Sequence, residues 1–329
     1  MVVVLLSPAK TLSWEPAPPG LPYAMPHLLP RSDTIAKLMK GKSVADLKSL
    51  LSVSPALATL NHERYQNFAL SDSVADKKGE LRPAAFAYDG PAFLGLEAET
   101  LSQSDLEHGQ SVLCILSGLY GVVHPLDLIQ PYRLEMGTKV ELEGEKCALS
   151  DFWRGDITEH ICQLLNEQQR SAGDKPPPPQ IVVNAASQEY ARAVDVKALR
   201  DTGVQVIDCT FHDDGRTVSV LAKRTRGLMA RHIIQSRAAS VDDIKAFSLE
   251  GYAFAEARST PENLVFERSK EARLSAVPAT RRGGAKEAPA PKPSSSSDSS
   301  KQKAKKAKTG RAEGDVEPPA KPVRKRSKH

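Results

Sequence analysis

Short apolar runs separated by turn residues recur along the first 275 residues of the chain. Val2–Leu6 is continuously apolar and β-branched at its start, a pattern typical of a central strand covered on both faces. Comparable runs predict further strands, which lie at Ala84–Tyr88, Val112–Leu116, Ile181–Val183, Val204–Cys209, Thr217–Ala222 and Leu264–Arg268. Several of these runs stop at a turn or a small polar residue, so side chains that bind a ligand are expected in the loops at strand ends.

Apolar residues at helical spacing predict helices between these strands. The longest is Phe152–Gln169, which is amphipathic. Val44–Leu51 and a helix that begins at Pro55 form a helix–short turn–helix unit, because proline fits the first turn of a helix. Shorter helices are predicted at Asp33–Met39, Ser104–Gly109 (with Ser102 or Ser104 as N-cap), Gly227–Arg237 and Asp242–Phe247. We therefore expect an α+β (mixed α/β) fold, a single compact domain over residues 1–275 with a mixed central sheet surrounded by helices.

The last part of the chain, residues 276–329, has a different composition. It is rich in Ser, Lys and Pro, and it has too few apolar residues to offset the entropy of ordering, so we expect a disordered tail. Residues 281–329 hold 15 Lys and Arg against 5 Asp and Glu, a net charge of +10, whereas the whole chain has +5. The globular part is therefore mildly acidic, and a nucleic-acid site on it must be a local basic patch.

The N-terminal apolar run is too short for a signal peptide and has no basic start, and no apolar run reaches the length of about 20 residues that spans a membrane. We expect a cytosolic protein without a membrane partner. The four cysteines, at positions 114, 147, 162 and 209, are too far apart for a zinc knuckle, and we expect them to be reduced and structural. The histidines are scattered, and no dinucleotide, Walker A or hydrolase fingerprint is present, so we expect no metal and no cofactor.

Two segments carry candidate chemistry. Ser117–Gly137 follows a predicted buried strand and combines three glycines with Tyr120, Tyr132, Arg133 and Glu135. It is either the lip of a pocket or a rigid structural loop in which Arg133 pairs with Glu135 or Asp127. Lys10 stands in the loop after the first strand, where it can hold a phosphate or be an ordinary exposed lysine.

The second segment, Lys223–Arg237, begins with basic residues, and the predicted helix Gly227–Arg237 follows them. Arg226 is predicted at the start of that helix, where free N–H groups and the helix dipole favour anions. Lys223, Arg224 and Arg231 are expected on the same side, so the segment either contacts phosphates or is a solvated charged face.

Several blocks of the sequence resemble the YaaA peroxide-stress protein family. They occur in the family's order between Met1 and Arg268, and they are Ser7–Leu12, Ser117–Gly137, Asn184–Tyr190, Ala222–Arg237, Phe247–Tyr252 and Leu264–Phe266. The resemblance implies a protein of the oxidative stress response that limits peroxide damage, is linked to lowered free iron, and binds DNA through a helix-hairpin-helix element and a basic cleft. The unit at residues 44–68 is the candidate for that element, although its turn has no glycine. His124, Asp89 and Phe93 depart from the family pattern, which has Arg, Lys and Tyr at these positions.

Two functional hypotheses follow from these residues. In the first, a monomeric stress protein without enzymatic activity binds double-stranded or structured DNA nonspecifically through Lys223, Arg224, Arg226 and Arg231, with help from Lys10 and Arg133. In the second, an enzyme binds a small phosphorylated or nucleotide-like ligand in a cleft formed by Lys10, Tyr120, Tyr132, Arg133, Glu135, Asn184 and Glu189. The basic tail is either solubilising or a polyanion-binding segment, and in a eukaryotic member it would also suit nuclear import.

Overall fold

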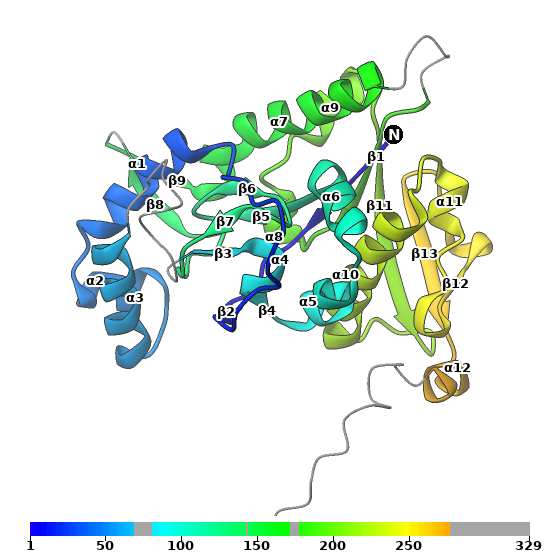
Figure 1. Ribbon diagram of the computed structural model, residues 1–329, viewed down its shortest axis with the longest axis horizontal. Coiled ribbons are helices and arrows are strands. Elements are labelled where there is room, and N and C mark those ends of the chain that lie inside the picture. Colours follow the sequence, from blue (N-terminus) through cyan, green and yellow to red (C-terminus); the bar gives the residue numbers. More distant parts are fainter. Residues whose placement is uncertain (69–80, 143, 172–177, 277–329) are drawn as a thin grey trace, which may run out of the picture. The chain divides into compact units, whose positions relative to one another are not determined.

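A seven-stranded mixed sheet forms the centre of the fold in the computed structural model (Figure 1), which describes residues 1–68, 81–142, 144–171 and 178–276. From one edge to the other, its strands are β12 (Ala253–Phe254), β13 (Asn263–Arg268), β11 (Gln205–Asp213), β10 (Ile181–Ala185), β1 (Val2–Leu6), β5 (Leu113–Ser117) and β6 (Gly121–Val123). The five inner strands run parallel, and each outermost strand is antiparallel to its neighbour. The expected mixed central sheet is therefore confirmed.

Three two-stranded pairs lie outside this sheet. They are β2 (Thr11–Leu12) with β4 (Tyr88–Asp89), β3 (Arg82–Pro83) with β7 (Leu128–Ile129), and β8 (Lys139–Leu142) with β9 (Glu145–Ala148). The first pair matters for the site, because it brings Tyr88 opposite Leu12, two residues after Lys10.

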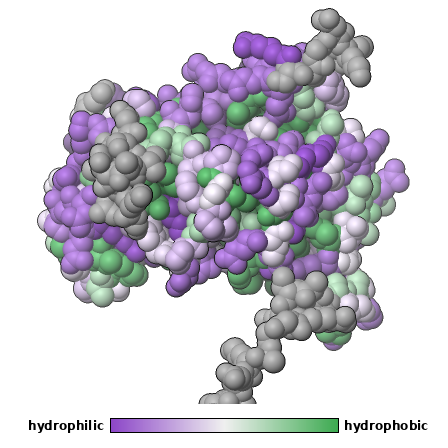
Figure 2. Space-filling model, in the orientation of Figure 1, coloured by the Kyte–Doolittle hydropathy of each residue, from purple (hydrophilic) through white to green (hydrophobic). Residues whose placement is uncertain are grey.

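Helices cover both faces of the sheet, which explains why all five residues of β1 are buried. The α-helices are α1 (Leu29–Lys40), α2 (Val44–Leu50), α3 (Pro55–Asn67), α4 (Ala84–Ala87), α5 (Pro91–Leu96), α6 (Gln103–Val112), α7 (Leu149–Ser171), α8 (Gln188–Ala191), α9 (Val196–Asp201), α10 (Ser219–Ser236), α11 (Val241–Lys245) and α12 (Lys270–Ser275). Both α10 and α7 contact β1, and they lie well apart in Figure 1. The face seen in Figure 2 is mostly hydrophilic, with apolar residues scattered across it.

The contact between α5 and α10 depends on two glycines. A Cβ atom on Gly227 would lie 1.7 Å from the carbonyl oxygen of Ala92, and one on Gly95 would lie 2.1 Å from that of Arg224. Only residues without a side chain permit this approach of the two backbones. The pair of helices therefore behaves as one rigid unit at the side of the sheet.

Two of the predicted strands are wrong. Residues Ala84–Ala87 form the buried helix α4, and only Tyr88 and Asp89 are extended; three of these four residues are alanine, which favours a helix. Thr217–Ala222 is not a strand either, because α10 begins at Ser219. The apolar residues that suggested the strand are not covered: Val218 and Val220 are 41% and 64% exposed.

Most other predicted elements are confirmed with shifted ends. The helix–turn–helix unit is present as α2 and α3, and Ser52 takes the left-handed conformation in its turn at φ 51°. The N–H groups of Ser52 and Val53 already donate to carbonyls of α2, at 3.3 and 3.2 Å. Ser102 is the N-cap of α6, in a capping box with Asp105.

Several expectations concern the ends and the surface of the chain. Residues 1–281 form one compact unit by their contacts. The basic tail lies outside the described residues from position 277 on. The four cysteines are free. In the part of the chain that the structure describes, we find no helix with the length and apolar character needed to cross a membrane.

Candidate functional site

The carboxyl ends of β1 and β10 meet at the point where the strand order reverses. The chain passes from β1 to β5 on one side, and later from β10 to β11 on the other. Open α/β sheets bind ligands outside the carboxyl ends of strands at such a point. Ser7, which follows β1, links the two strand ends: its hydroxyl oxygen accepts a hydrogen bond from the Ser187 N–H at 2.8 Å and lies 3.3 Å from the Ser187 hydroxyl.

Three charged side chains of the sequence prediction gather at this edge. The Glu135 carboxylate lies 3.2 Å from Nε of Arg133 and 3.4 Å from Nζ of Lys10. Arg133 and Glu135 are mostly covered, with 21% and 16% of their side chains exposed, whereas Lys10 is 67% exposed. Arg133 thus pairs with Glu135, as one of the two alternatives predicted. Because two cations share one carboxylate, their combined charge exceeds that of Glu135.

Glu189 joins the same edge from α8. Its carboxylate accepts a hydrogen bond from the Gly137 N–H at 3.0 Å. This contact ties the end of the Ser117–Gly137 segment to the first residues after β10. The site at the strand ends, which we call the carboxyl-edge site, therefore comprises Ser7, Lys10, Arg133, Glu135 and Glu189.

A chain of buried hydroxyl groups lies beside these charges. The Ser117 hydroxyl oxygen accepts hydrogen bonds from the N–H groups of Leu119 and Tyr120, at 3.2 and 3.0 Å, so its own proton is directed to the Tyr132 oxygen 2.6 Å away. The hydroxyl groups of Tyr132 and Tyr88 share a hydrogen bond at 2.7 Å, in which either can be the donor. Burial raises the pKa of Tyr132 to about 12 and that of Tyr88 well above its usual value, so both phenols are protonated donors.

Tyr120 does not belong to the site. It is 1% exposed, and its hydroxyl oxygen accepts a hydrogen bond from the Gln130 N–H at 3.0 Å inside the core. Burial raises its pKa strongly, so it is a neutral structural phenol. The structure thus brings together five of the seven residues predicted for the cleft, while Tyr120 lies below it and Asn184 lies in a separate groove.

That groove, which has a volume of about 720 Å³, runs from the end of β10 over β11 to β13. Asn184 lines it and donates to the Asp208 carboxylate at 2.7 Å. Arg192 and Arg226 line the same groove. Arg226 has no hydrogen bond or ion pair with any described residue, and burial lowers the pKa of its guanidinium.

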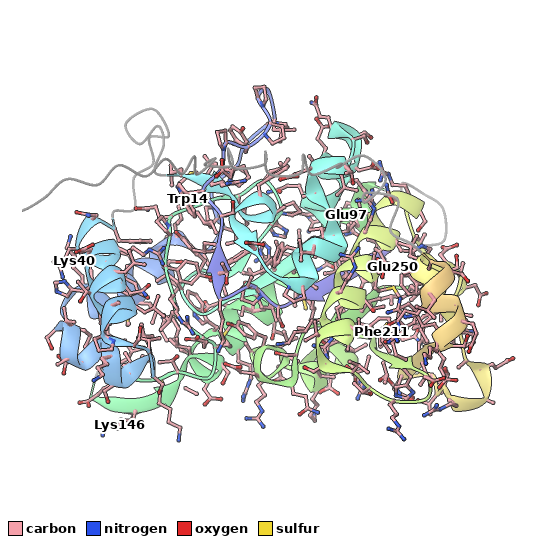
Figure 3. The ribbon with its side chains drawn as sticks, turned by 90° about the horizontal axis from the view of Figure 1, so that it is seen from below. Trp14, Lys40, Glu97, Lys146, Phe211 and Glu250 are labelled. Atoms are coloured by element: carbon pink, nitrogen blue, oxygen red, sulfur yellow. The ribbon has the colours of Figure 1, made fainter. Side chains whose placement is uncertain are left out.

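The other basic residues of α10 are placed differently from the prediction. Arg226 is the eighth residue of α10 rather than its first, because α10 begins at Ser219, so the free N–H groups of the helix start are remote from it. Arg224 is bound within the protein: it lies 2.7 Å from the Glu250 carboxylate and 3.6 Å from that of Glu97, and Figure 3 shows these two glutamates close together. Lys223 is exposed.

Arg224 and Arg231 also bind carbonyl groups at the C-terminal end of α5. Arg224 donates to the carbonyl of Leu94 at 2.5 Å, and Arg231 donates to those of Leu96 and Glu97 at 2.9 and 3.0 Å. The last carbonyls of a helix have no partners within it, so these bonds satisfy groups that would otherwise be unpaired. Both arginines therefore donate hydrogen bonds within the protein, and these bonds compete with the binding of a phosphate.

A buried histidine pair lies elsewhere, under α7. Nδ1 of His124 is 2.9 Å from the Leu113 carbonyl, so it carries the proton, and Nε2 of His124 accepts from His160 at 2.8 Å. Burial lowers the pKa of His124 to about 4 and that of His160 to about 3, so both rings are neutral. His124 therefore supplies no positive charge. Among the described residues, no three His, Cys, Asp or Glu side chains form a group that could hold a metal ion.

Sequence reasoning missed Ser7, Ser187 and Tyr88. The two serines carried a usable signal, because each follows directly or closely on a buried parallel strand. Tyr88 carried none, since only the pairing of β4 with β2 brings it to this edge.

Comparison with known proteins gives a consistent result. The family model described as "Peroxide stress protein YaaA" matches residues 1–258. The chain is 42% identical over 276 residues to a UPF0246 protein of Verminephrobacter eiseniae, covering 82% of this chain and all of that protein. It is 43% identical over 275 residues to a UPF0246 protein of Variovorax paradoxus, covering 81% of this chain and 99% of that protein. The chain therefore belongs to the YaaA peroxide stress protein family, also named UPF0246.

Proposed function

We propose that this peroxide stress protein binds a small phosphorylated or nucleotide-like ligand at the carboxyl-edge site. The observation that carries the proposal is the sharing of one carboxylate, that of Glu135, by Lys10 and Arg133 at the end of the parallel strands. A phosphate group of the ligand would pair with the exposed ammonium group of Lys10 and with the guanidinium of Arg133. Electrostatic contacts of this kind are strongest where one partner is already fixed and partly desolvated, as Arg133 is.

The remaining groups of the site suit the rest of such a ligand. Carboxylates accept hydrogen bonds from hydroxyl groups, so Glu135 and Glu189 would receive those of a ribose or another sugar. If the ligand is also transformed, Glu135 or Glu189 is the candidate general base.

The proposal is tested by thermal unfolding with and without nucleoside monophosphates, with the matching nucleosides as controls. We expect a monophosphate to raise the unfolding temperature of the wild type, because a ligand that binds only the folded state stabilises it. Lys10→Ala should lose this shift. Lys146→Ala removes another exposed lysine, on β9, and should keep the shift. Equal shifts in wild type and Lys10→Ala, or no shift with any monophosphate, would refute the proposal.

DNA binding is a second candidate, supported by the groove over β11. Arg226 and Arg192 line that groove, and Arg226 has no partner among the described residues, so it is the residue of the basic segment best able to accept a phosphate. Because Arg224 and Arg231 are bound within the protein, this candidate rests on Arg226, Arg192 and exposed Lys223 rather than on the whole basic segment.

A salt series distinguishes the groove from the tail. The logarithm of the DNA association constant falls linearly with the logarithm of the salt concentration, and each phosphate contact contributes about 0.9 to the slope for double-stranded DNA. We expect Arg226→Gln to reduce that slope by about one contact. The same measurement on a chain that ends at Arg281 separates the contribution of the tail. An unchanged slope in Arg226→Gln would exclude the groove as the DNA site.

A further inference from the structure

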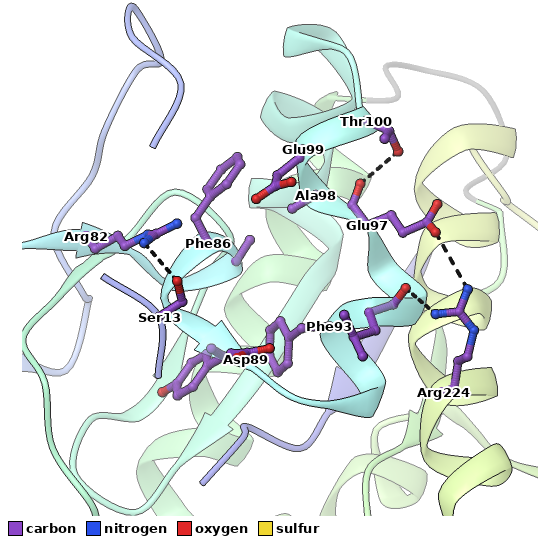
Figure 4. Close-up of a pocket in the computed structure, with 13 residues that line it drawn as sticks. Ser13, Arg82, Phe86, Asp89, Phe93, Glu97, Ala98, Glu99, Thr100 and Arg224 are labelled. Atoms are coloured by element: carbon purple, nitrogen blue, oxygen red, sulfur yellow. Dashed lines mark hydrogen bonds and ion pairs between the residues drawn. The ribbon is translucent and has the colours of Figure 1, made fainter. Parts of the chain in front are cut away.

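A second pocket of about 650 Å³ lies beside α5 (Figure 4), and none of the charged residues of the carboxyl-edge site lines it. Its walls come from β3, α4, β4, α5, the 3-10 turn at Ala98–Thr100, and α10. A volume of this size is in the range of small-molecule sites. The function proposed above makes no use of this pocket.

One wall of the pocket carries a buried cation with unused donors. Arg82 is 4% exposed, and its one side-chain hydrogen bond to a described residue goes from Nη1 to the Ser13 hydroxyl at 3.3 Å. Nε is fully buried and has no partner. A guanidinium has five N–H donors, and a buried charged donor without an acceptor costs about 1–3 kcal/mol or more. Burial accordingly lowers the pKa of Arg82, against the opposing effect of nearby Glu99.

Two carboxylates, one from β4 and one from the 3-10 turn, also line the pocket. Asp89 and Glu99 line the pocket, are exposed, and have no ion-pair or hydrogen-bond partner among the described residues. Figure 4 shows the Glu99 carboxylate directed into the same space as the Arg82 guanidinium. The other arginine of the pocket, Arg224, is already bound to Glu250 and to the Leu94 carbonyl. The groups left for a ligand are therefore one cation and two carboxylates, a combination that disfavours a polyanion.

The rest of the lining is apolar. Phe86 and Phe93 are each 6% exposed, whereas Leu94 at the rim is 57% exposed. A large exposed leucine beside two aromatic rings offers contact to an apolar group without any rearrangement of the core. The lining of the pocket thus combines charged groups of both signs with apolar side chains.

From this arrangement we propose that the pocket binds a small zwitterionic ligand of the amino-acid type with an apolar side chain. Its carboxylate would pair with the guanidinium of Arg82, which favours planar carboxylates through paired N–H bonds. Its ammonium group would lie between Asp89 and Glu99, and its side chain would contact Phe86, Phe93 and Leu94. Such a ligand has no net charge, and its carboxylate oxygens would accept hydrogen bonds from the guanidinium of Arg82.

The test uses titration calorimetry on the full chain with three probes: L-phenylalanine, N-acetyl-L-phenylalanine, which lacks the ammonium group, and L-phenylalaninamide, which lacks the carboxylate. We expect L-phenylalanine to bind, and each of the other two to bind at least about tenfold more weakly, since a charge-assisted hydrogen bond is worth about 1.5–3 kcal/mol. Absence of binding by L-phenylalanine at millimolar concentration would refute the proposal.

Variants assign each end of the probe to its partner. In Arg82→Gln, L-phenylalanine and its amide should bind equally weakly, because the carboxylate has lost its partner. In the Asp89→Asn, Glu99→Gln double variant, L-phenylalanine and its N-acetyl derivative should bind equally. These two acidic residues are exposed, so this second variant keeps the test decisive if Arg82→Gln does not fold. A preference for L-phenylalanine that survives both variants would overturn the assignment.

Lys10→Ala serves as the control for the other site. It should bind L-phenylalanine like the wild type, because Lys10 does not line this pocket. Loss of nucleotide binding at the carboxyl-edge site would leave the amino-acid result unchanged, so the two proposals fail independently.

Discussion

The packing of α5 against α10 makes a sharp prediction about Gly227. Replacing it by alanine places a Cβ atom 1.7 Å from the carbonyl oxygen of Ala92, where an ordinary van der Waals contact is 3.4–4 Å. The obstructing atom belongs to the backbone, so no side chain can rotate away. The two helices must therefore move apart by well over an ångström, or the substituted helix must deform.

The magnitude follows from what that movement breaks. Overpacking a well-packed contact costs about 1–3 kcal/mol, occasionally more. Separation of the helices also stretches the hydrogen bonds that Arg224 and Arg231 donate to the end of α5, and a hydrogen bond to a charged group contributes about 1.5–3 kcal/mol. The higher helix propensity of alanine returns about 1 kcal/mol. We expect Gly227→Ala to lower the free energy of unfolding by about 3 kcal/mol or more.

Urea unfolding followed by circular dichroism measures this change. The transition midpoint of Gly227→Ala should fall by about 1 M or more, with its slope unchanged. Gly155→Ala is the matched control: Gly155 is also inside a helix, α7, but a Cβ atom there would meet nothing within 4 Å. This control should be more stable than the wild type by about 0.5–1 kcal/mol, from helix propensity alone.

The reasoning is refuted if Gly227→Ala unfolds within about 0.5 kcal/mol of the wild type, which is the usual range of a neutral surface substitution. That result would mean that α5 and α10 separate freely, and the arginine contacts at the end of α5 would then contribute little. Loss of stability in Gly155→Ala would instead show that glycine-to-alanine changes in this protein act through the unfolded chain or the helix itself.

Three further predictions concern buried polar groups. Because His124 and His160 are neutral in the folded protein, the protein should become less stable as the pH falls below about 6.5, where the unfolded chain binds protons that the folded chain excludes. His160→Gln should lower the slope of the unfolding free energy against pH by roughly 1.4 kcal/mol per pH unit between about pH 4 and 6.5. An unchanged slope would contradict the assignment of two neutral rings. Arg268→Met should cost about 3–5 kcal/mol in urea unfolding, since it leaves the Asp213 carboxylate, 2.5 Å from Nε, buried without its cation; a loss below about 1 kcal/mol would show that Asp213 finds another partner. Trp153→Phe removes an indole N–H bond of 3.0 Å to a buried carbonyl and should cost about 2 kcal/mol, whereas unchanged thermal unfolding would mean that water replaces the bond.

The predicted positions of the buried strands and of Lys10 are largely confirmed because these features are local. Val2–Leu6 is apolar at every position, and only a strand covered on both faces hides all five side chains. The residues that follow such a strand must lie at its carboxyl edge, so Lys10 was placed correctly relative to the sheet. The sequence left Ser102 and Ser104 as candidates for the N-cap of α6, and the structure selects Ser102, which forms a capping box with Asp105.

Other assignments failed where burial or pairing depended on distant residues. The alanine-rich run before Tyr88 is equally compatible with a strand and with a short buried helix, and periodicity cannot separate the two over four residues. The apolar residues at the start of α10 suggested a strand, but Val220 is exposed. As a consequence Arg226 moved from the helix start to its interior, and the argument from the helix dipole no longer applied to it.

The amino-acid sequence by itself determined the family, the mixed fold, the central strands and the presence of charged residues after them. Only the tertiary structure decided which of those charges are available. Arg224 and Arg231 look like phosphate ligands in the sequence, yet they complete the end of α5, whereas Arg82, which attracted no attention there, faces a pocket with unused donors. The physical reason is that a charge acts through its nearest partners, and the α5 carbonyls that Arg224 and Arg231 bind are 130 and 135 residues away in the chain, which no local pattern records.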